Sequence, residues 1–287
     1  MKNSILIFDV EKSSGIHLII RPGAIGDFVL SLPALECLRG SYTEVWAASQ
    51  NLPLARFAER ARSIASTGLD LLGLPDTAPP AHLVETLGRF EQILSWYGAN
   101  RAEFRAAAAG LPFHFFDALP PEGWRRPAVD FYLDQARSLG FSPEEARPRI
   151  PCHRPRSDFA VIHPFSGSRR KNWPLERFQE LARRLSGRLP VTWCAGPEEP
   201  LRDAVRIENL YDLAQWLGTA RLFIGNDSGI AHLAAAAGTP VVAVFGPTDP
   251  AVWAPRGEPV EVVAGRLEEI EATQVFAACM RVLDSTP

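Results

Sequence analysis

The segment from residue 221 to residue 255 constrains the fold of this chain more than any other. Its sequence is RLFIGNDSGIAHLAAAAGTPVVAVFGPTDPAVWAP, and it predicts a buried strand, a polar loop, a helix of small residues, a second buried strand and a Gly-Pro-Thr turn. Four consecutive alanines leave little side-chain volume, so the helix can lie close to the sheet. This order of elements is typical of a parallel sheet in an α/β protein.

The polar loop in this segment predicts a ligand site. Asn226, Asp227 and Ser228 fall where the first strand ends and the helix begins. Ligands bind at this edge of an open α/β sheet, and the N–H groups at the start of a helix attract phosphate. His232 projects from the same helix face as the loop. Taken singly, each residue fits a structural role as well as a ligand site: Asp227 or Ser228 as a helix cap, and His232 as a half-buried histidine. Together with Gly229 they favour a site.

Composition limits the class of protein. The 287 residues, of which 46% are hydrophobic, are enough for two modest α/β domains or one large one. A net charge of −3 argues against a nucleic-acid binder. The four cysteines are widely spaced, which argues against a zinc site or disulfide framework and indicates reduced thiols. No apolar run approaches the roughly 20 residues of a membrane span. We therefore expect a cytoplasmic protein, with room for peripheral contact at the inner face of a membrane.

Strands and helices alternate along both halves of the chain. In the first half we predict strands at 17–21, 44–48, 92–96 and 113–116, with an additional strand at 5–8, and helices at 27–39, 54–62, 82–90 and 101–109. After a helix at 131–139 and a proline-rich linker at 147–156, we predict strands at 159–163, 191–194, 222–225, 241–245 and 260–263, and helices at 175–185, 210–217 and 268–283. The pattern predicts two doubly wound domains, residues 1–145 and 146–287, with a terminal helix that can pack back on the first domain.

A glycine-rich loop follows the first main strand. It reads RPGAIGD from Arg21 to Asp27, and its spacing differs from the G-x-G-x-x-G dinucleotide pattern. Gly23 and Gly26 allow another molecule to approach the backbone closely. Asp27 stands at the head of the next helix, where it either caps the helix or acts as a general base. The positive end of the helix would hold this carboxylate ionised.

A second loop, PFSGSRRK at residues 164–171, enters the helix that begins near Pro174. Ser166, Gly167 and Ser168 offer hydroxyl and backbone donors to a phosphate. Lys171 is the only lysine after position 12 in a chain that otherwise uses arginine. This exception indicates that the position requires a compact ammonium group. A solvated basic loop is the ordinary interpretation of such a run. A second strand–loop–helix motif in the same half favours an anion site.

The chain resembles glycosyltransferase family 9, the heptosyltransferases of lipopolysaccharide core assembly, in the segments RPGAIGDFVLSLPAL, HPFSGSRRKNWPLERFQEL and GNDSGIAHLAAAAGTPVVAVFGPTDP. The resemblance implies a GT-B architecture, in which two Rossmann-like domains face each other across a cleft. It implies a nucleotide-sugar donor, typically ADP-heptose, on the second domain and a saccharide or glycolipid acceptor on the first. It further implies inverting transfer without a metal or other cofactor.

The resemblance also implies roles for individual residues. It makes Asp27 the base that deprotonates the acceptor hydroxyl. It implies that the donor is bound by Ser166, Gly167, Ser168, Lys171, Glu198, Asp227, Ser228, Gly229 and His232. Within this set, Glu198 is assigned to the ribose. The acceptor-side loop contributes Arg21, Gly23 and Gly26.

Two other functions are compatible with the same motifs. One is a nucleotide-sugar epimerase of similar architecture, which would convert the donor without an acceptor. The other is a non-catalytic nucleotide-sugar-binding protein. A dehydrogenase is the least favoured function, because neither glycine loop has the dinucleotide spacing.

Overall fold

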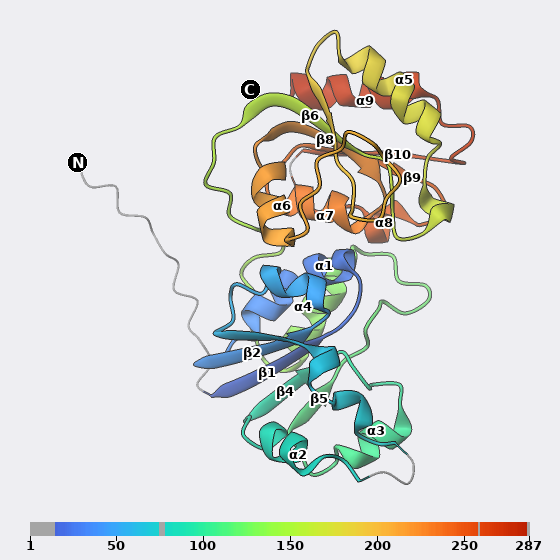
Figure 1. Ribbon diagram of the computed structural model, residues 1–287. Helices are drawn as coiled ribbons and strands as arrows, with labels where there is room; N and C mark the ends of the chain where they lie inside the picture. Colours follow the sequence, from blue (N-terminus) through green and yellow to red (C-terminus); the bar gives the residue numbers. More distant parts are fainter. Residues whose placement is uncertain (1–14, 75–77, 258, 286–287) are drawn as a thin grey trace, which may run out of the picture. The chain divides into compact units, whose positions relative to one another are not determined.

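The chain forms two parallel five-stranded sheets in the computed structural model, which describes residues 15–74, 78–257 and 259–285 (Figure 1). The strand predicted at 5–8 lies outside the described residues. Of the described residues, one compact unit comprises those in 15–22, 34–118 and 135–144. The other comprises those in 23–33, 119–134 and 145–285. The α/β class with two doubly wound sheets is confirmed.

The first sheet has the order β3-β2-β1-β4-β5. Its strands are β1 (Ile16–Arg21), β2 (Tyr42–Ala47), β3 (Arg60–Ser63), β4 (Gln92–Ser95) and β5 (Phe113–Phe115). The helices of this half are α1 (Ile25–Cys37), α2 (Ala81–Leu87) and α3 (Ala102–Ala107), with short 3-10 turns at Ser49–Leu54, Ile64–Ser66 and Leu69–Leu71. The strand order reverses between β1 and β4, so the glycine-rich loop follows a strand at the switch point.

One face of the first sheet is covered by α2 and α3. Leu18 and Ile20 of β1 point to this face, and Leu83 and Phe104 come from the two helices. The intervening residue Ile19 points to the opposite face and is also fully buried. Burial on both faces is the reason that these strands read as continuous apolar runs.

The helix predicted at residues 54–62 is wrong. The 3-10 turn ends at Leu54, and β3 then pairs with β2 in parallel. Arg60 and Arg62, two positions apart, both direct guanidinium groups to Glu44, at 3.9 and 3.8 Å. That spacing is the period of a strand, and pairing along the sheet edge overrides the helix propensity of the segment.

The second sheet has the order β10-β9-β8-β6-β7. Its strands are β6 (Ser157–His163), β7 (Val191–Trp193), β8 (Ala220–Asn226), β9 (Val241–Phe245) and β10 (Val260–Ala264). The remaining helices are α4 (Ala128–Ser138), α5 (Leu175–Leu185), α6 (Leu210–Leu217), α7 (Gly229–Ala236), α8 (Pro250–Trp253) and α9 (Ala272–Asp284), with a 3-10 turn at Arg169–Lys171. Because β6 and β8 are neighbours although β7 lies between them in the chain, their carboxyl ends form the switch point of this sheet.

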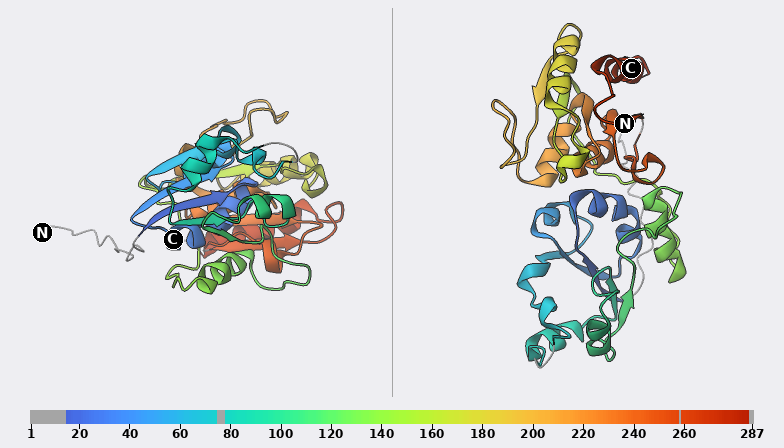
Figure 2. Two further views of the ribbon diagram at one scale, coloured as in Figure 1. Left: turned by 90° about the horizontal axis from the view of Figure 1, so that it is seen from below. Right: turned by 90° about the vertical axis from the view of Figure 1, so that its right-hand side faces the viewer.

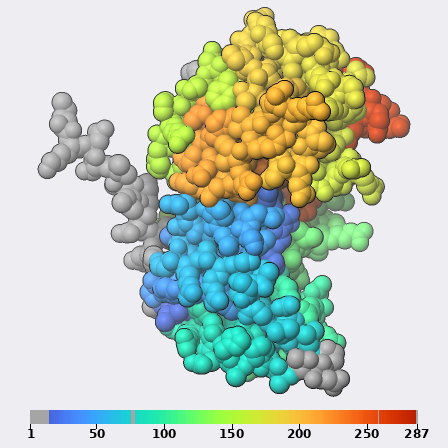
Figure 3. Space-filling model, in the orientation of Figure 1, coloured from blue at the N-terminus to red at the C-terminus, as the bar shows by residue number. Residues whose placement is uncertain are grey.

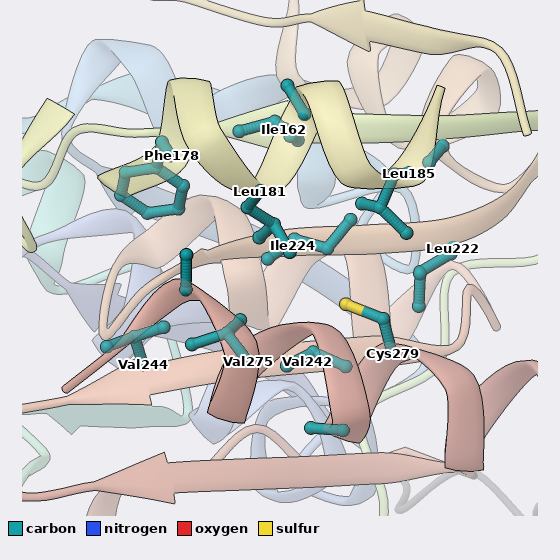
Figure 4. Packing of buried hydrophobic residues seen from close by; sticks show 14 of the residues in the cluster. Ile162, Phe178, Leu181, Leu185, Leu222, Ile224, Val242, Val244, Val275 and Cys279 are labelled. Atoms are coloured by element: carbon teal, nitrogen blue, oxygen red, sulfur yellow. The ribbon is translucent and has the colours of Figure 1, made fainter. Parts of the chain in front are cut away.

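Two helices cover one face of the second sheet, and α6, α7 and α8 lie on the other (Figure 1). The covering pair, α5 and α9, lie side by side in Figure 1 and in the right view of Figure 2. Phe178 and Leu181 of α5 meet Val275 and Cys279 of α9 over the apolar strands (Figure 4). The predicted helix at 268–283 begins later, at Ala272, because a capping box fixes its start.

Helix α7 lies close to the sheet, as its alanines predict. Ala231 and Ala234 are completely buried, and the helix contacts β8 and β9. None of the helices that the structure describes combines the length and the apolar character that crossing a membrane requires.

Candidate functional site

A pocket of about 480 Å³ opens in the second unit, beside the carboxyl ends of β6, β8 and β9. Ligands of open α/β sheets bind at this edge. Its lining residues are Ala24, Gly26, Asp27, Leu30, Leu119, Gly167, Ser168, Lys171, Asp227, Ser228, Gly229, His232, Thr248 and Trp253. The three motifs singled out in the sequence therefore contribute to one pocket.

Asn226 fixes the loop after β6 against the end of β8. Its side chain is fully buried. The Nδ2 group donates to the backbone carbonyl of Pro164 at 2.8 Å, and Oδ1 accepts from the backbone N–H of Trp173 at 2.9 Å. One amide thus satisfies a donor and an acceptor at the two ends of the loop that carries Lys171. The sequence indicates a polar strand end here but does not reveal this pairing.

Trp173 anchors the same loop from the other side. Its ring is buried, donates through Nε1 to the carbonyl of Ile270 at 3.0 Å, and packs edge-on against Phe178. Trp173 and Phe178 are the residue before the Pro174 cap and the fourth residue of α5, which is the arrangement of a hydrophobic staple. The entry of the chain into α5 is therefore rigid.

Asp227 is the centre of a three-residue polar cluster. Its carboxylate is 5% exposed and accepts from Lys171 Nζ at 2.7 Å and from Thr248 Oγ1 at 2.6 Å. Both donors contact the same oxygen, Oδ2. A buried carboxylate is costly unless it is paired, and these two contacts provide the pairing. The Gly-Pro-Thr turn was noted in the sequence, but the contact of Thr248 with Asp227 was missed.

Ser228 begins α7. Its hydroxyl accepts from the backbone N–H of Ala231 at 3.3 Å, so the side chain is an N-cap. The next residue, Gly229, has no room for a side chain, because a Cβ there would lie 2.7 Å from Cβ of Ile25 and 2.9 Å from the backbone nitrogen of Gly26. At Gly229 the start of α7 therefore lines the pocket with backbone atoms and no side chain.

His232 lies one turn into α7 and is 5% exposed. Its Nδ1 atom is buried without a hydrogen-bond partner in the described part of the chain. Burial lowers the pKa of the ring to about 4; the carboxylate of Asp227 opposes this shift and the ammonium of Lys171 adds to it. The imidazole at the pocket is therefore neutral at neutral pH.

This buried ring predicts a pH dependence of stability. The unfolded chain binds the proton of His232 with a pKa near 6.5, and the folded chain with a pKa of about 4. Between these values the unfolded state binds more protons, so stability falls as the pH is lowered through this window, by up to about 3 kcal/mol from this group. Denaturation of wild type and His232→Gln at a series of pH values measures it. Parallel curves for the two proteins would contradict the assignment.

Some residues of the loop after β6 line the pocket, and Ser166 makes hydrogen bonds within the loop itself. Gly167, Ser168 and Lys171 line the pocket. The Ser166 hydroxyl instead lies 2.7 Å from the carbonyl of Ser168 and 2.9 Å from Oδ1 of Asn172, with the geometry of a donor to both. Ser166 thus shapes the loop, and its direct contact with a phosphate stays a prediction.

Two adjacent carboxylates after β7 differ in environment. Glu198 is exposed and does not line the pocket. Glu199 accepts from the backbone N–H of Gly196 at 2.6 Å and lies 3.2 Å from Nε2 of His163. Burial opposes the ionisation of Glu199, but the hydrogen bond and charge of His163, together with that N–H, outweigh it and lower its pKa. The segment from 195 to 209, gold to orange in Figure 3, forms surface of the second unit. The sequence did not single out Glu199, and the ribose role of Glu198 stays a prediction.

In the glycine-rich loop, Asp27 lines the pocket, whereas Arg21 contacts residues of the first unit. Gly23 has φ of +120°, a conformation that favours glycine, and Asp27 lies in the first turn of α1. Asp27 lines the pocket. Arg21 is buried at the end of β1, donates to the carbonyl of Ala118 at 3.3 Å and lies over the ring of Trp96. These two contacts lie within the first unit, and the acceptor-side role of Arg21 stays a prediction.

Within the ranges described, no group of three His, Cys, Asp or Glu side chains is placed to hold a metal ion. The cysteines are unpaired thiols, and two of them, Cys194 and Cys279, are buried. Burial, together with the nearby Glu199, raises the pKa of Cys194 to about 12.

Comparison with known proteins decides the family. The profile of glycosyltransferase family 9 (heptosyltransferase) matches residues 126–278, which is more than half of the 287 residues. The chain belongs to glycosyltransferase family 9. The resemblance inferred from the three sequence segments is confirmed, and the match covers the loops of Lys171, Asp227 and Thr248.

A curated relative of this family 9 chain is lipopolysaccharide heptosyltransferase 1 of Pseudomonas aeruginosa. The two are 38% identical over 93 residues, which cover 28% of this chain and 26% of the relative. The match thus spans about a quarter of the length of that relative.

Solved structures of family members share the fold along nearly the whole chain. A family 9 glycosyltransferase of Veillonella parvula superposes with a TM-score of 0.75 at 17% identity, covering 96% of this chain and 99% of the other. Heptosyltransferase WaaC of E. coli, solved with ADP, gives 0.69 at 18% identity, covering 93% and 99%. WaaC has also been solved with ADP-2-deoxy-2-fluoro heptose. TibC of E. coli, with a TM-score of 0.62 at 16% identity, covers 96% of this chain and 77% of the other and is described as iron-containing. At these identities the likeness shows the GT-B fold.

Proposed function

We propose that this protein transfers heptose from ADP-heptose to a saccharide acceptor of the lipopolysaccharide-core type, with inversion at the anomeric carbon. The observation that carries the proposal is the pocket at the β6–β8 switch point in a family 9 chain. Lys171 and the bare start of α7 are anion-binding groups, and the carboxylate of Asp27 lines the same pocket.

The donor is expected to place its diphosphate between the loop after β6 and the start of α7. A lysine and helix N–H groups supply positive charge there without a metal ion. Backbone donors from Gly167 and Ser168 would complete the contact, because both residues line the pocket. Complexes of WaaC with ADP and an ADP-heptose analogue support an adenine nucleotide as the donor of this relative.

The reaction needs one base and one stabilised leaving group. Asp27 accepts the proton of an acceptor hydroxyl while that oxygen forms its bond to the anomeric carbon of heptose. The bond between this carbon and the phosphate oxygen breaks, and ADP departs with the electron pair. Lys171 and the N–H groups of α7 stabilise the charge that develops on the diphosphate. Attack opposite the leaving group inverts the configuration.

The acceptor and the site of action complete the proposal. A saccharide or glycolipid acceptor approaches Asp27 from the glycine-rich loop, and the protein acts in the cytoplasm, at the inner face of the membrane when the acceptor is a glycolipid. Turnover is expected without added metal. Because TibC is described as iron-containing, assays are run with a chelator and with iron.

A transfer assay tests this function. The protein is incubated with ADP-heptose and a core-type saccharide, and the products are analysed by mass spectrometry and NMR. The proposal predicts a saccharide heavier by one heptose, an inverted linkage and one ADP per transfer. Donor that is converted to an isomer in the absence of acceptor would indicate an epimerase. Intact donor under every condition, despite binding, would indicate a non-catalytic binding protein.

A further inference from the structure

Thr248 follows the carboxyl end of β9 and lines the pocket beside Asp227 and Lys171. Its hydroxyl donates to Oδ2 of Asp227 at 2.6 Å, and Lys171 Nζ donates to the same oxygen at 2.7 Å. The other carboxylate oxygen, Oδ1, accepts no hydrogen bond from the described residues, and it is not among the buried atoms that lack a partner. Solvent therefore reaches Oδ1, and the open space that Asp227 lines is the pocket.

A carboxylate held in this way is prepared to accept hydrogen bonds from a ligand. Two donors on Oδ2 fix the orientation of the carboxylate of Asp227, and the lone pairs of Oδ1 remain available. The ligand groups that would satisfy them are hydroxyls. In a nucleotide-sugar the ribose and the transferred sugar carry hydroxyls, whereas the diphosphate carries none and would be repelled by a carboxylate. The ribose is common to ADP and the nucleotide-sugar, so a comparison of these two ligands distinguishes the two sets of hydroxyls.

The two donors on Oδ2 are expected to respond differently to a diphosphate. Lys171 carries a full charge, so an arriving diphosphate would compete with Asp227 for its ammonium. The hydroxyl of Thr248 carries no net charge and loses nothing by staying on Oδ2. Thr248 is therefore the contact that keeps Asp227 oriented when the donor is bound.

We propose that Thr248 is a positioning residue for the sugar half of the donor, because it holds Oδ2 of Asp227 so that Oδ1 accepts hydrogen bonds from hydroxyls of the transferred sugar. This inference rests on the proposed function and specifies which part of the donor Asp227 recognises. Thr248 itself acts through Asp227.

A comparison of two ligands isolates this role. ADP lacks the transferred sugar, and ADP-heptose carries it with all of its hydroxyls, so the ratio of their dissociation constants in the absence of acceptor measures recognition of the sugar. Calorimetry determines this ratio for wild type, Thr248→Val and Thr248→Ser. Thr248→Ala is measured in parallel, because it removes the hydroxyl without adding an apolar branch.

A matched control is provided by Thr239. Its hydroxyl is also a hydrogen-bond donor, to the carbonyl of Leu217 at 2.8 Å, and it is fully buried and does not line the pocket. Thr239→Val therefore removes a threonine hydrogen bond without touching Asp227. We expect it to lower the melting temperature and to leave the ligand ratio unchanged.

The proposal predicts that Thr248→Val and Thr248→Ala bind ADP within about twofold of wild type but lose about tenfold in the preference for the sugar-bearing ligand, the size of one hydrogen bond to a charged group. Thr248→Ser restores the preference. In turnover, KM for the donor rises more than kcat falls, and acceptor KM is unchanged.

An unchanged ratio in both hydroxyl-free variants would overturn the proposal, and so would an equal loss for the two ligands, which indicates a merely structural role. If wild type binds neither ligand, the proposed function fails and the inference fails with it. If wild type prefers the sugar-bearing ligand and both hydroxyl-free variants keep that preference intact, only the inference about Thr248 is overturned and the proposed function stands.

Discussion

Replacing Asp27 by Asn is expected to lower turnover by about 10²–10⁴ while ADP affinity stays within about twofold of wild type. The amide has nearly the shape of the carboxylate but cannot accept a proton from the acceptor hydroxyl. Asp27 lies in the first turn of α1, where the positive end of the helix favours the ionised form of a base. Initial rates at saturating donor, with ADP titrations by calorimetry, separate the two quantities.

The matched control is Asp212→Asn. Asp212 is also in the first turn of a helix, α6, and its side chain is exposed. Both substitutions remove a favourable interaction with a helix dipole, but only one removes the proposed base. We expect Asp212→Asn to turn over at the wild-type rate. A loss of less than threefold for Asp27→Asn would show that Asp27 only stabilises the first turn of its helix.

Replacing Asn226 by Ala is expected to lower the free energy of unfolding by about 3 kcal/mol, because it leaves the buried N–H of Trp173 and the carbonyl of Pro164 unpaired. The loop that carries Lys171 would lose its attachment to β8, and ADP affinity should weaken as well. Urea denaturation at constant m-value gives the stability change.

Asn209→Ala is the control for this substitution. The Asn209 side chain also binds two backbone groups, the N–H groups of Tyr211 and Asp212, but it is an exposed helix cap. Its loss is expected to cost about 1 kcal/mol. A cost for Asn226→Ala no larger than this would contradict the role of Asn226 as the clamp of the pocket loop.

Local signals were sufficient for many elements. The helices at 175–185 and 210–217 and the strand at 241–245 have the predicted bounds. The first has strong apolar periodicity after Trp173-Pro174, and the strand is a short apolar run between Gly238 and Gly246. The segment 54–62 was misassigned because its place at the sheet edge depends on pairing with β2, which no local pattern encodes.

In the site, too, local sequence signals identified some residues and missed those whose positions depend on strand pairing. The loops after strands identified seven donor-side residues that line one pocket with Asp27: Gly167, Ser168, Lys171, Asp227, Ser228, Gly229 and His232. Ser166 and Glu198 were predicted as well but do not line it. Thr248 and Trp253 were not selected, although both line it. The contact of Thr248 with Asp227 follows from β9 lying beside β8, and the order of strands in a sheet is a property of the whole fold.

The central claim is that this pocket binds an adenine diphosphate donor, and thermal unfolding with ADP, UDP, GDP and CDP tests it most directly. At about 100 times its dissociation constant, a ligand stabilises the folded state by about 2.7 kcal/mol. The account predicts selective stabilisation by ADP that is lost in Lys171→Ala. A preference for UDP or GDP would contradict the ADP-linked donor, and the absence of a shift with every diphosphate would contradict a nucleotide site in this pocket.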